Sequence, residues 1–194
     1  MRISILIISA LLSLFLPVLG QQDPARPKKV INPEQQALQQ QMRETDAERQ
    51  RFRSYAKQAF DSEMAREKVG DCPDAKTTYE FNVCYGKEVA ATDQNIENYE
   101  DGIRHLLGMR DSSPSGQPLP PGPAGPQLSA EQQLAEFERV EQLWHSYLDA
   151  ASTAAFHQFG GGTGGPSFEM ETHLRVVRSH MRELDSVYGS LLRL

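Results

Sequence analysis

The chain has 194 residues, of which 39% are hydrophobic and 24% are charged, and its formal net charge is −6. This composition is sufficient to bury one modest core but not two. The acidic balance disfavours nucleic acid and anionic membrane surfaces as ligands, and it favours a basic protein partner.

Residues 1–20 are typical of a secretory signal peptide. Arg2 supplies the positive start, a largely apolar run extends to Leu16, and the small residue Gly20 suits cleavage before Gln21. The alternative, an uncleaved membrane anchor, needs about twenty apolar residues and better flanks. Without Arg2 the exported chain has 19 basic and 26 acidic residues, a charge of −7. The sequence therefore predicts a periplasmic or secreted protein with no membrane span after cleavage.

Residues 21–31 are polar and contain proline, so we expect them to be disordered. Residues 32–69 form a Gln-rich segment that predicts a helix, with Asn32 as N-cap and Pro33 at the first helical position. Its apolar stripe is thin, which predicts weak packing on the rest of the chain; it consists of Leu38, Met42, Phe52, Ala56, Phe60 and Met64.

Cys72 and Cys84 are the two cysteines of the chain. In an exported protein, two cysteines predict one disulfide. The alternatives, a catalytic thiol or a metal pair, need a basic or His-rich neighbourhood, whereas acidic residues surround this pair. A continuous helix would hold the two Cα atoms about 18 Å apart, but a disulfide needs them within about 7 Å. If the cysteines are bonded, Cys72 therefore lies outside the helix that contains Cys84, and Pro73 and the Thr77 cap provide the break.

Thr77 and Glu80 have the spacing of a capping box, which predicts the start of a long helix that reaches about Gly108. One face of this helix is apolar, with Phe81, Cys84, Val89, Ile96, Tyr99, Ile103 and Leu107. The Pro/Gly-rich residues 111–128 that follow are interpreted as a long loop inside one helical domain, residues 70–190.

Ser129 and Gln132 form a second capping box in front of another helix. Its stripe is Leu134, Phe137, Val140, Trp144, Tyr147, Leu148, Ala151 and Ala155. A Gly-rich turn leads to a last helix from about Ser167, whose apolar residues alternate at spacings of four and three and predict packing on another helix. We find no convincing strand pattern. The predicted fold class is all-α: a small antiparallel helical bundle with one disulfide, preceded by the Gln-rich helix.

No pattern of side chains predicts catalysis, a cofactor or a metal site. His145 and Asp149 have a spacing that can ligate zinc, but the HExxH signature is missing, so we expect a solvent-exposed pair. The stretch GGGTGG at residues 160–165 lacks the Gly-Lys-Ser/Thr ending of a phosphate loop. Trp144 is expected in the core, with contact to a partner as the alternative.

Several short motifs follow one another in a characteristic order. Cys72, a Thr-led helix start at residues 77–82, Cys84 and the stretch TDQNI at residues 92–96 form the first half. WHSYLDAA at residues 144–151, a Gly-rich turn and RSHMREL at residues 178–184 form the second. This order resembles the LprI-like lysozyme-inhibitor family of exported bacterial proteins, although members often bear a second cysteine pair that this chain lacks.

The resemblance implies a lysozyme-inhibitor-like role, in which the exported chain acts by binding a protein and is not an enzyme. A charge of −7 suits a basic lysozyme. The candidate partner-binding residues are Asp93, Glu97, Glu100 and Trp144, and a solvated helix face is the other explanation for the three acids. Two other classes stay open: a structural or scaffold protein of the cell envelope that acts through helix–helix association, and a hydrolase or metal protein. The sequence predicts neither the individual partner nor the oligomeric state.

Overall fold

The computed structural model describes residues 32–109, 128–160 and 162–193. Side-chain caps begin the first three helices of these ranges. Helix α1 (Pro33–Val69) begins after Asn32, whose side chain accepts a hydrogen bond from the Glu34 N–H at 3.2 Å. Helices α2 (Thr78–Gly108) and α3 (Ala130–His157) begin with the two predicted capping boxes. These three helix starts agree with the prediction to within one residue.

Helix α4 (Gly165–Leu192) begins two residues before the predicted start at Ser167. Pro166 explains the difference, because its fixed φ suits the first helical turn and its missing N–H has no partner to lose there. The predicted signal peptide (1–20), the segment 21–31 and the predicted loop 111–128, except its last residue, lie outside the described residues.

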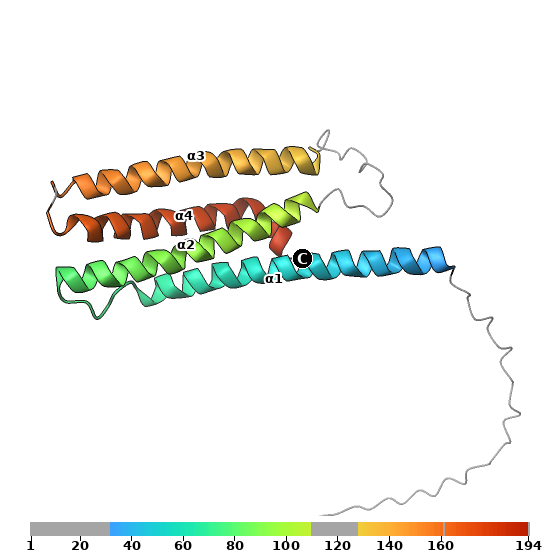
Figure 1. The fold of residues 1–194 in the computed structure, drawn as a ribbon, viewed down its shortest axis with the longest axis horizontal. Coiled ribbons are helices and arrows are strands. Elements are labelled where there is room, and N and C mark those ends of the chain that lie inside the picture. Colours follow the sequence, from blue (N-terminus) through green and yellow to red (C-terminus); the bar gives the residue numbers. More distant parts are fainter. Residues whose placement is uncertain (1–31, 110–127, 161, 194) are drawn as a thin grey trace, which may run out of the picture.

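Consecutive helices run antiparallel, and α2 and α4 form the centre of the bundle (Figure 1). Helix α1 packs on this central pair from one side and α3 from the other, and no contact between α1 and α3 occurs within the described ranges. The structure contains no strand in the part of the chain that it describes. The predicted all-α bundle with one disulfide is confirmed.

None of the four helices is long and apolar enough to cross a lipid bilayer.

The core is built mainly from the predicted faces of α2 and α4. Tyr99 and Ile103 on α2 meet Val177 and Met181 on α4, and Phe137 on α3 completes the centre. All five side chains are inaccessible to solvent. The predicted stripe of α3 is divided, because Phe137, Leu148 and Ala155 are buried while Val140 and Tyr147 face solvent.

Helix α1 changes character along its length. In its C-terminal half Ala56 and Ala59 are buried in the core. Gly102 lies so close to α1 that a Cβ there would be 2.5 Å from Ala56 Cβ, so α1 and α2 are in close contact. In the N-terminal half Leu38 and Met42 are exposed, and this half projects beyond the bundle (Figure 1). The weak packing predicted for the whole segment therefore applies to its N-terminal half alone.

The disulfide joins Cys72 and Cys84 with Cα atoms 5.9 Å apart, which confirms the predicted bridge. As expected, Cys72 lies outside the helices, where its φ of 53° and a hydrogen bond from the Ala75 N–H to its carbonyl oxygen turn the chain back toward α2. A closed loop of this length stabilises the fold by about 3 kcal/mol.

A buried ionic network ties α1, α2 and α4 to the turn before α2. Glu63 is 0% exposed and accepts hydrogen bonds from Arg178 (2.7 Å), Arg66 (2.7 Å), Thr92 (2.8 Å) and Asn95 (2.8 Å). Burial alone would raise the pKa of Glu63, but the hydrogen bonds from Asn95, Arg178 and Thr92 and the charge of Arg66 hold it below its ordinary value. Every oxygen of this carboxylate is satisfied.

Arg178 also donates two hydrogen bonds to Asp71, at 2.6 and 2.7 Å, so its guanidinium holds Asp71 and Glu63 together. Asp71 directly precedes Cys72, and the disulfide and this bidentate ion pair therefore anchor the same short turn.

Candidate functional site

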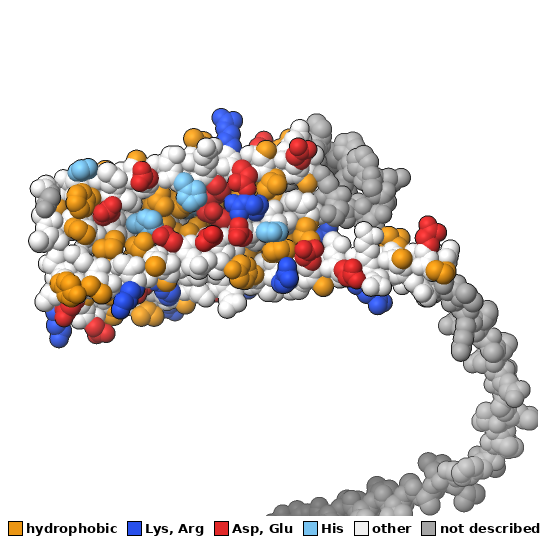
Figure 2. Space-filling view, in the orientation of Figure 1, with side chains coloured by type: hydrophobic (Ala, Val, Ile, Leu, Met, Phe, Trp, Pro, Cys, Tyr) orange, Lys and Arg blue, Asp and Glu red, His pale blue; other side chains and the backbone are white. Residues whose placement is uncertain are grey.

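An open groove of about 480 Å³ lies between α2, α3 and α4. All four candidate partner-binding residues line it: Asp93, Glu97 and Glu100 from α2 and Trp144 from α3. The other lining residues are Ile96, Asp101, Arg104, His145, Leu148 and His173, and we call this site the acidic groove. In the view of Figure 2, acidic side chains gather over the middle of the bundle with histidine and basic side chains among them.

The α2 residues reach one groove because they are spaced by four and three residues, which places them on one helix face. Asp93 and Glu97 are exposed, and Asp93 Oδ1 lies 2.6 Å from His173 Nε2 of α4. Glu100 differs from them, since it is 6% exposed and points into the bundle's interior rather than to solvent.

Trp144 is half-buried and stacks on His180 of α4, with ring centroids 4.0 Å apart and planes inclined by 10°. It packs against the core and also lines both the acidic groove and a second groove of about 460 Å³ that includes Tyr147 and Arg175. The expected core packing of Trp144 is therefore observed for part of the ring, and the rest of the ring lines the two grooves.

An exposed apolar stripe runs along α3 beside Trp144. Val140, Leu143 and Tyr147 are spaced as i, i+3 and i+7, and Leu143 and Tyr147 are 63% and 61% exposed. We call these three residues the α3 stripe. Apolar side chains at this spacing on the outside of a helix form a continuous surface for contact with another molecule.

Two carboxylates meet beneath the acidic groove. Glu141 of α3 is 3% exposed and lies near Glu100 of α2, and His145 Nε2 is 3.9 Å from Glu100 Oε2. One side-chain oxygen or nitrogen from each of Glu100, Glu141 and His145 lies within 4.8 Å of the others. We call these three residues the buried acid cluster.

The environment of the buried acid cluster changes the pKa of Glu100. Burial raises the pKa of Glu100 to about 9, and the neighbouring Glu141 adds to this increase through its charge and a hydrogen bond. At neutral pH Glu100 therefore holds a proton and adds no charge to the acidic groove. Glu100 Oε1 is buried, and no hydrogen-bond partner for it lies in the part of the chain that the structure describes.

On the far side of the cluster, His180 Nε2 donates to both oxygens of Glu141, at 3.0 and 3.2 Å. The Trp144 ring stacked on His180 fixes the plane of the imidazole that makes these hydrogen bonds. The Glu141 carboxylate is therefore held in one orientation, with His180 behind it and Glu100 and His145 in front.

Sequence reasoning did not identify Glu141. The spacing of seven residues between His173 and His180 favours a coincidental surface pair, but the structure buries His180 against Glu141. A signal for Glu141 was present, because it lies between Phe137 and Leu148 on the stripe of α3, where an apolar residue is expected. His180 likewise lies between Val177 and Leu184 on the apolar face of α4. His145 was considered with Asp149 as its partner, but the structure places His145 beside Glu100, and Asp149 is exposed.

The chain matches no protein-family model, no curated protein and no solved structure.

Proposed function

We propose that the chain is an exported, non-enzymatic binding protein whose partner is a basic protein of the lysozyme class. The observation that carries the proposal is the placement of Asp93, Glu97 and Trp144 around one groove, next to the α3 stripe. The LprI-like motif order and the acidic charge of the chain support the same class of partner.

The chemistry of this face suits recognition of a basic surface. Asp93 and Glu97 are exposed charges at the rim of the groove. Such charges accelerate association with a cationic partner, and added salt screens this attraction. Trp144 and Tyr147 offer aromatic side chains, which supply much of the binding energy when a partner covers them. A charged rim around aromatic anchors is the usual composition of a protein-binding site.

We expect the purified protein to inhibit a basic lysozyme in a cell-wall lysis assay at low salt, and we expect inhibition to decline as salt is added. Combining Asp93→Asn, Glu97→Gln and Tyr147→Ala should weaken inhibition by about tenfold or more, because it removes two rim charges and an exposed anchor. These side chains lie outside the core, so the variant should fold normally.

The matched control is the variant Glu44→Gln with Glu48→Gln, which loses the same two charges from the exposed N-terminal half of α1. It should inhibit like the unmodified protein. Unchanged lysozyme activity at a large molar excess of inhibitor and low salt would reject the proposal. Equal losses in both variants would show that net charge alone is responsible and would reject the groove as the binding site.

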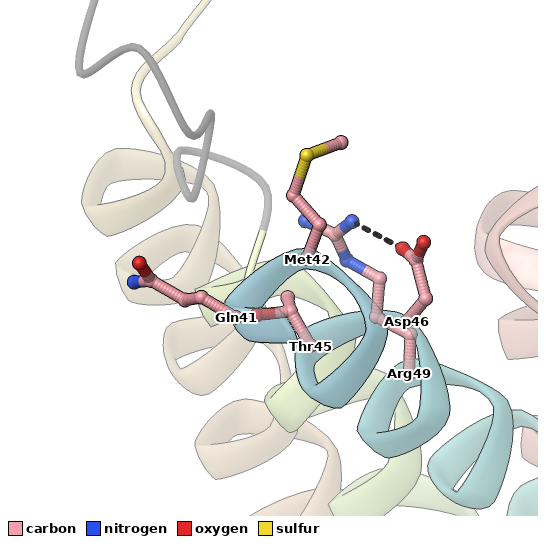
Figure 3. A pocket seen from close by; sticks show the side chains of 5 residues that line it. All are labelled: Gln41, Met42, Thr45, Asp46 and Arg49. Carbon is pink, nitrogen blue, oxygen red and sulfur yellow. Dashed lines mark hydrogen bonds and ion pairs between the residues drawn. The ribbon is translucent and has the colours of Figure 1, made fainter. Parts of the chain in front are cut away.

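A second candidate function, a scaffold of the cell envelope that associates through helices, is favoured by the projecting half of α1. Leu38 and Met42 are exposed there at successive turns. Met42 also lines a shallow pocket with Gln41, Thr45, Asp46 and Arg49, in which Arg49 is paired with Asp46 at 3.4 Å (Figure 3). A half-helix whose apolar residues have no packing partner among the described residues is suited to pairing with another helix.

Light scattering tests this second function. If α1 mediates association, the full chain should have a mass above that of one copy, and Leu38→Gln with Met42→Gln should return it to one copy. A deletion of residues 21–45 should also give the mass of one copy. The deletion stops before Arg49 because Arg49 binds the Met109 carbonyl oxygen at 2.9 Å and Ala56 is in the core. A single-copy mass for the full chain would exclude self-association through α1.

A further inference from the structure

Two carboxylates and an imidazole converge in the buried acid cluster from two helices. Glu141 and His145 are four residues apart and share one face of α3, and Glu100 reaches them from α2. We propose that Glu100, Glu141 and His145 bind one divalent first-row transition-metal ion, such as zinc, at the floor of the acidic groove. This inference goes beyond the proposed function, since it requires no protein partner.

The donor set fits this class of ion. Carboxylate oxygen and imidazole nitrogen are ligands of zinc, iron and manganese, and three protein ligands leave a coordination position open for water. In a tetrahedral zinc site the ligand atoms lie about 3.4 Å apart, so the three atoms, now within 4.8 Å of one another, need to approach by about 1.4 Å at most. His145 is exposed, and side-chain rotation supplies this movement.

The unpartnered oxygen of Glu100 points to a missing ligand. Glu100 Oε1 is buried and has no hydrogen-bond donor among the described residues, a state that is unfavourable for a carboxyl group in a protein interior. Arg104, the arginine that lines the groove, is already paired with Asp101 and Glu138. A dication between Glu100 and Glu141 would provide a ligand for this oxygen of Glu100.

The other buried carboxylate of the bundle shows what a structural ion pair looks like in this protein. Glu63 is surrounded by Arg178, Arg66, Thr92 and Asn95, and both of its oxygens are satisfied. Glu100 and Glu141 are about as deeply buried, but no arginine in the described ranges donates a hydrogen bond to either, and His180 serves Glu141 alone. The protein can thus satisfy a buried carboxylate with arginine, and at the buried acid cluster it does not.

A supporting shell is also in place. His180 Nε2 donates to Glu141, and Trp144 stacks on the His180 ring, so the Glu141 carboxylate is oriented before an ion binds. Hydrogen bonds from outside the ligand set raise metal affinity by holding ligands in position. Two of the three ligands, Glu100 and His145, also line the acidic groove with Trp144, so an ion there would be reached from this groove.

Calorimetric titration of tag-free, chelator-treated protein with Zn²⁺ tests the proposal. We expect saturable binding of one ion per chain. Glu100→Gln and His145→Ala should each weaken zinc binding by about tenfold or more. Both variants should fold, because glutamine keeps the shape of Glu100 and His145 is exposed, and circular dichroism will verify this.

His173→Ala is the matched control, because His173 lies in the same groove but pairs with Asp93 outside the cluster. It should bind zinc like the unmodified protein. Loss of binding in His173→Ala with retention in Glu100→Gln would assign the ion to the Asp93–His173 pair and overturn the proposal. Absence of saturable binding at several-fold excess zinc would also overturn it. Zinc binding without lysozyme inhibition would leave this site standing and reject only the proposed function.

Discussion

Arg178→Ala is expected to lower the free energy of unfolding by about 3 kcal/mol, the largest loss that we predict for a single substitution. The side chain is 4% exposed, and its removal leaves Glu63 buried with less positive charge and Asp71 without its two donors. Arg66 still contacts Glu63, which places the effect at the lower end of the range for a broken buried ion pair. Urea denaturation followed by circular dichroism at neutral pH measures this change.

Arg182→Ala provides the control, because Arg182 is one turn further along α4 and pairs with Glu67 at the surface. Arg182→Ala should lower the free energy of unfolding by less than about 1 kcal/mol. The double variant Glu63→Gln with Arg178→Met should be more stable than Arg178→Ala, since Glu63 is then no longer a buried charge that has lost its arginine, while Asp71 loses its donors in both variants. Equal stabilities for Arg178→Ala and Arg182→Ala would contradict a structural role for the network.

Glu100→Gln is expected to stabilise the metal-free protein by about 3 kcal/mol at pH 7. Folded Glu100 titrates near a pKa of about 9, whereas its ordinary value is 4.5. Burial is the main cause of the raised pKa, and the charge of Glu141 is the next. The charged and titratable groups around Glu100 are Asp101 and Arg104 on α2, Glu141 and His145 on α3, and His180 of α4 behind Glu141. Glutamine is neutral at every pH and keeps the shape of the protonated acid.

The sign of the pH dependence follows from the proton count. Between pH 4.5 and pH 9 the folded protein holds a proton on Glu100 that the unfolded chain has released. The contribution of Glu100 to stability is therefore fully present below pH 4.5, and it is lost by about 1.4 kcal/mol per pH unit as the pH rises toward 9. The difference in free energy of unfolding between Glu100→Gln and the unmodified protein should accordingly be small near pH 4.5 and grow as the pH rises.

Urea denaturation at several pH values in the presence of a chelator measures this difference. Glu97→Gln is the matched control, because Glu97 is on the same helix, in the same groove and exposed. Its stability should differ little from that of the unmodified protein at any pH. A Glu100→Gln variant that is less stable than the unmodified protein at pH 7 would show that the Glu100 carboxyl is ionised in the folded state.

The helices were predictable because their signals are local. Thr77 with Glu80 and Ser129 with Gln132 each begin a helix through contacts within one turn. The bridge between Cys72 and Cys84 was predictable too, since composition and Pro73 leave few alternatives. The apolar faces of α2 and α4 were recognisable from spacing alone, because these two helices are covered on several sides and bury a wide stripe.

The site was predictable only in part, because it depends on which helices meet. The spacing of Asp93, Glu97 and Glu100 placed them on one face of α2, but nothing in the spacing showed that Glu100 is buried. Glu100 is buried where α2 packs on α3, beside Glu141, which is more than thirty residues away in the sequence. Val140 and Tyr147 were misassigned to the core for the same reason, since α3 is covered on one side and its apolar stripe is wider than that contact.

The adjacency of Asp71 and Cys72 links a covalent bond to an ion pair. The disulfide restricts where the turn before α2 can go, and so it raises the effective concentration of Asp71 at the guanidinium of Arg178. Arg178 in turn holds the turn in the position in which the two sulfur atoms meet. The contributions of the disulfide and the ion pair to the free energy of unfolding are therefore coupled. Removing both should not cost the sum of removing each one alone.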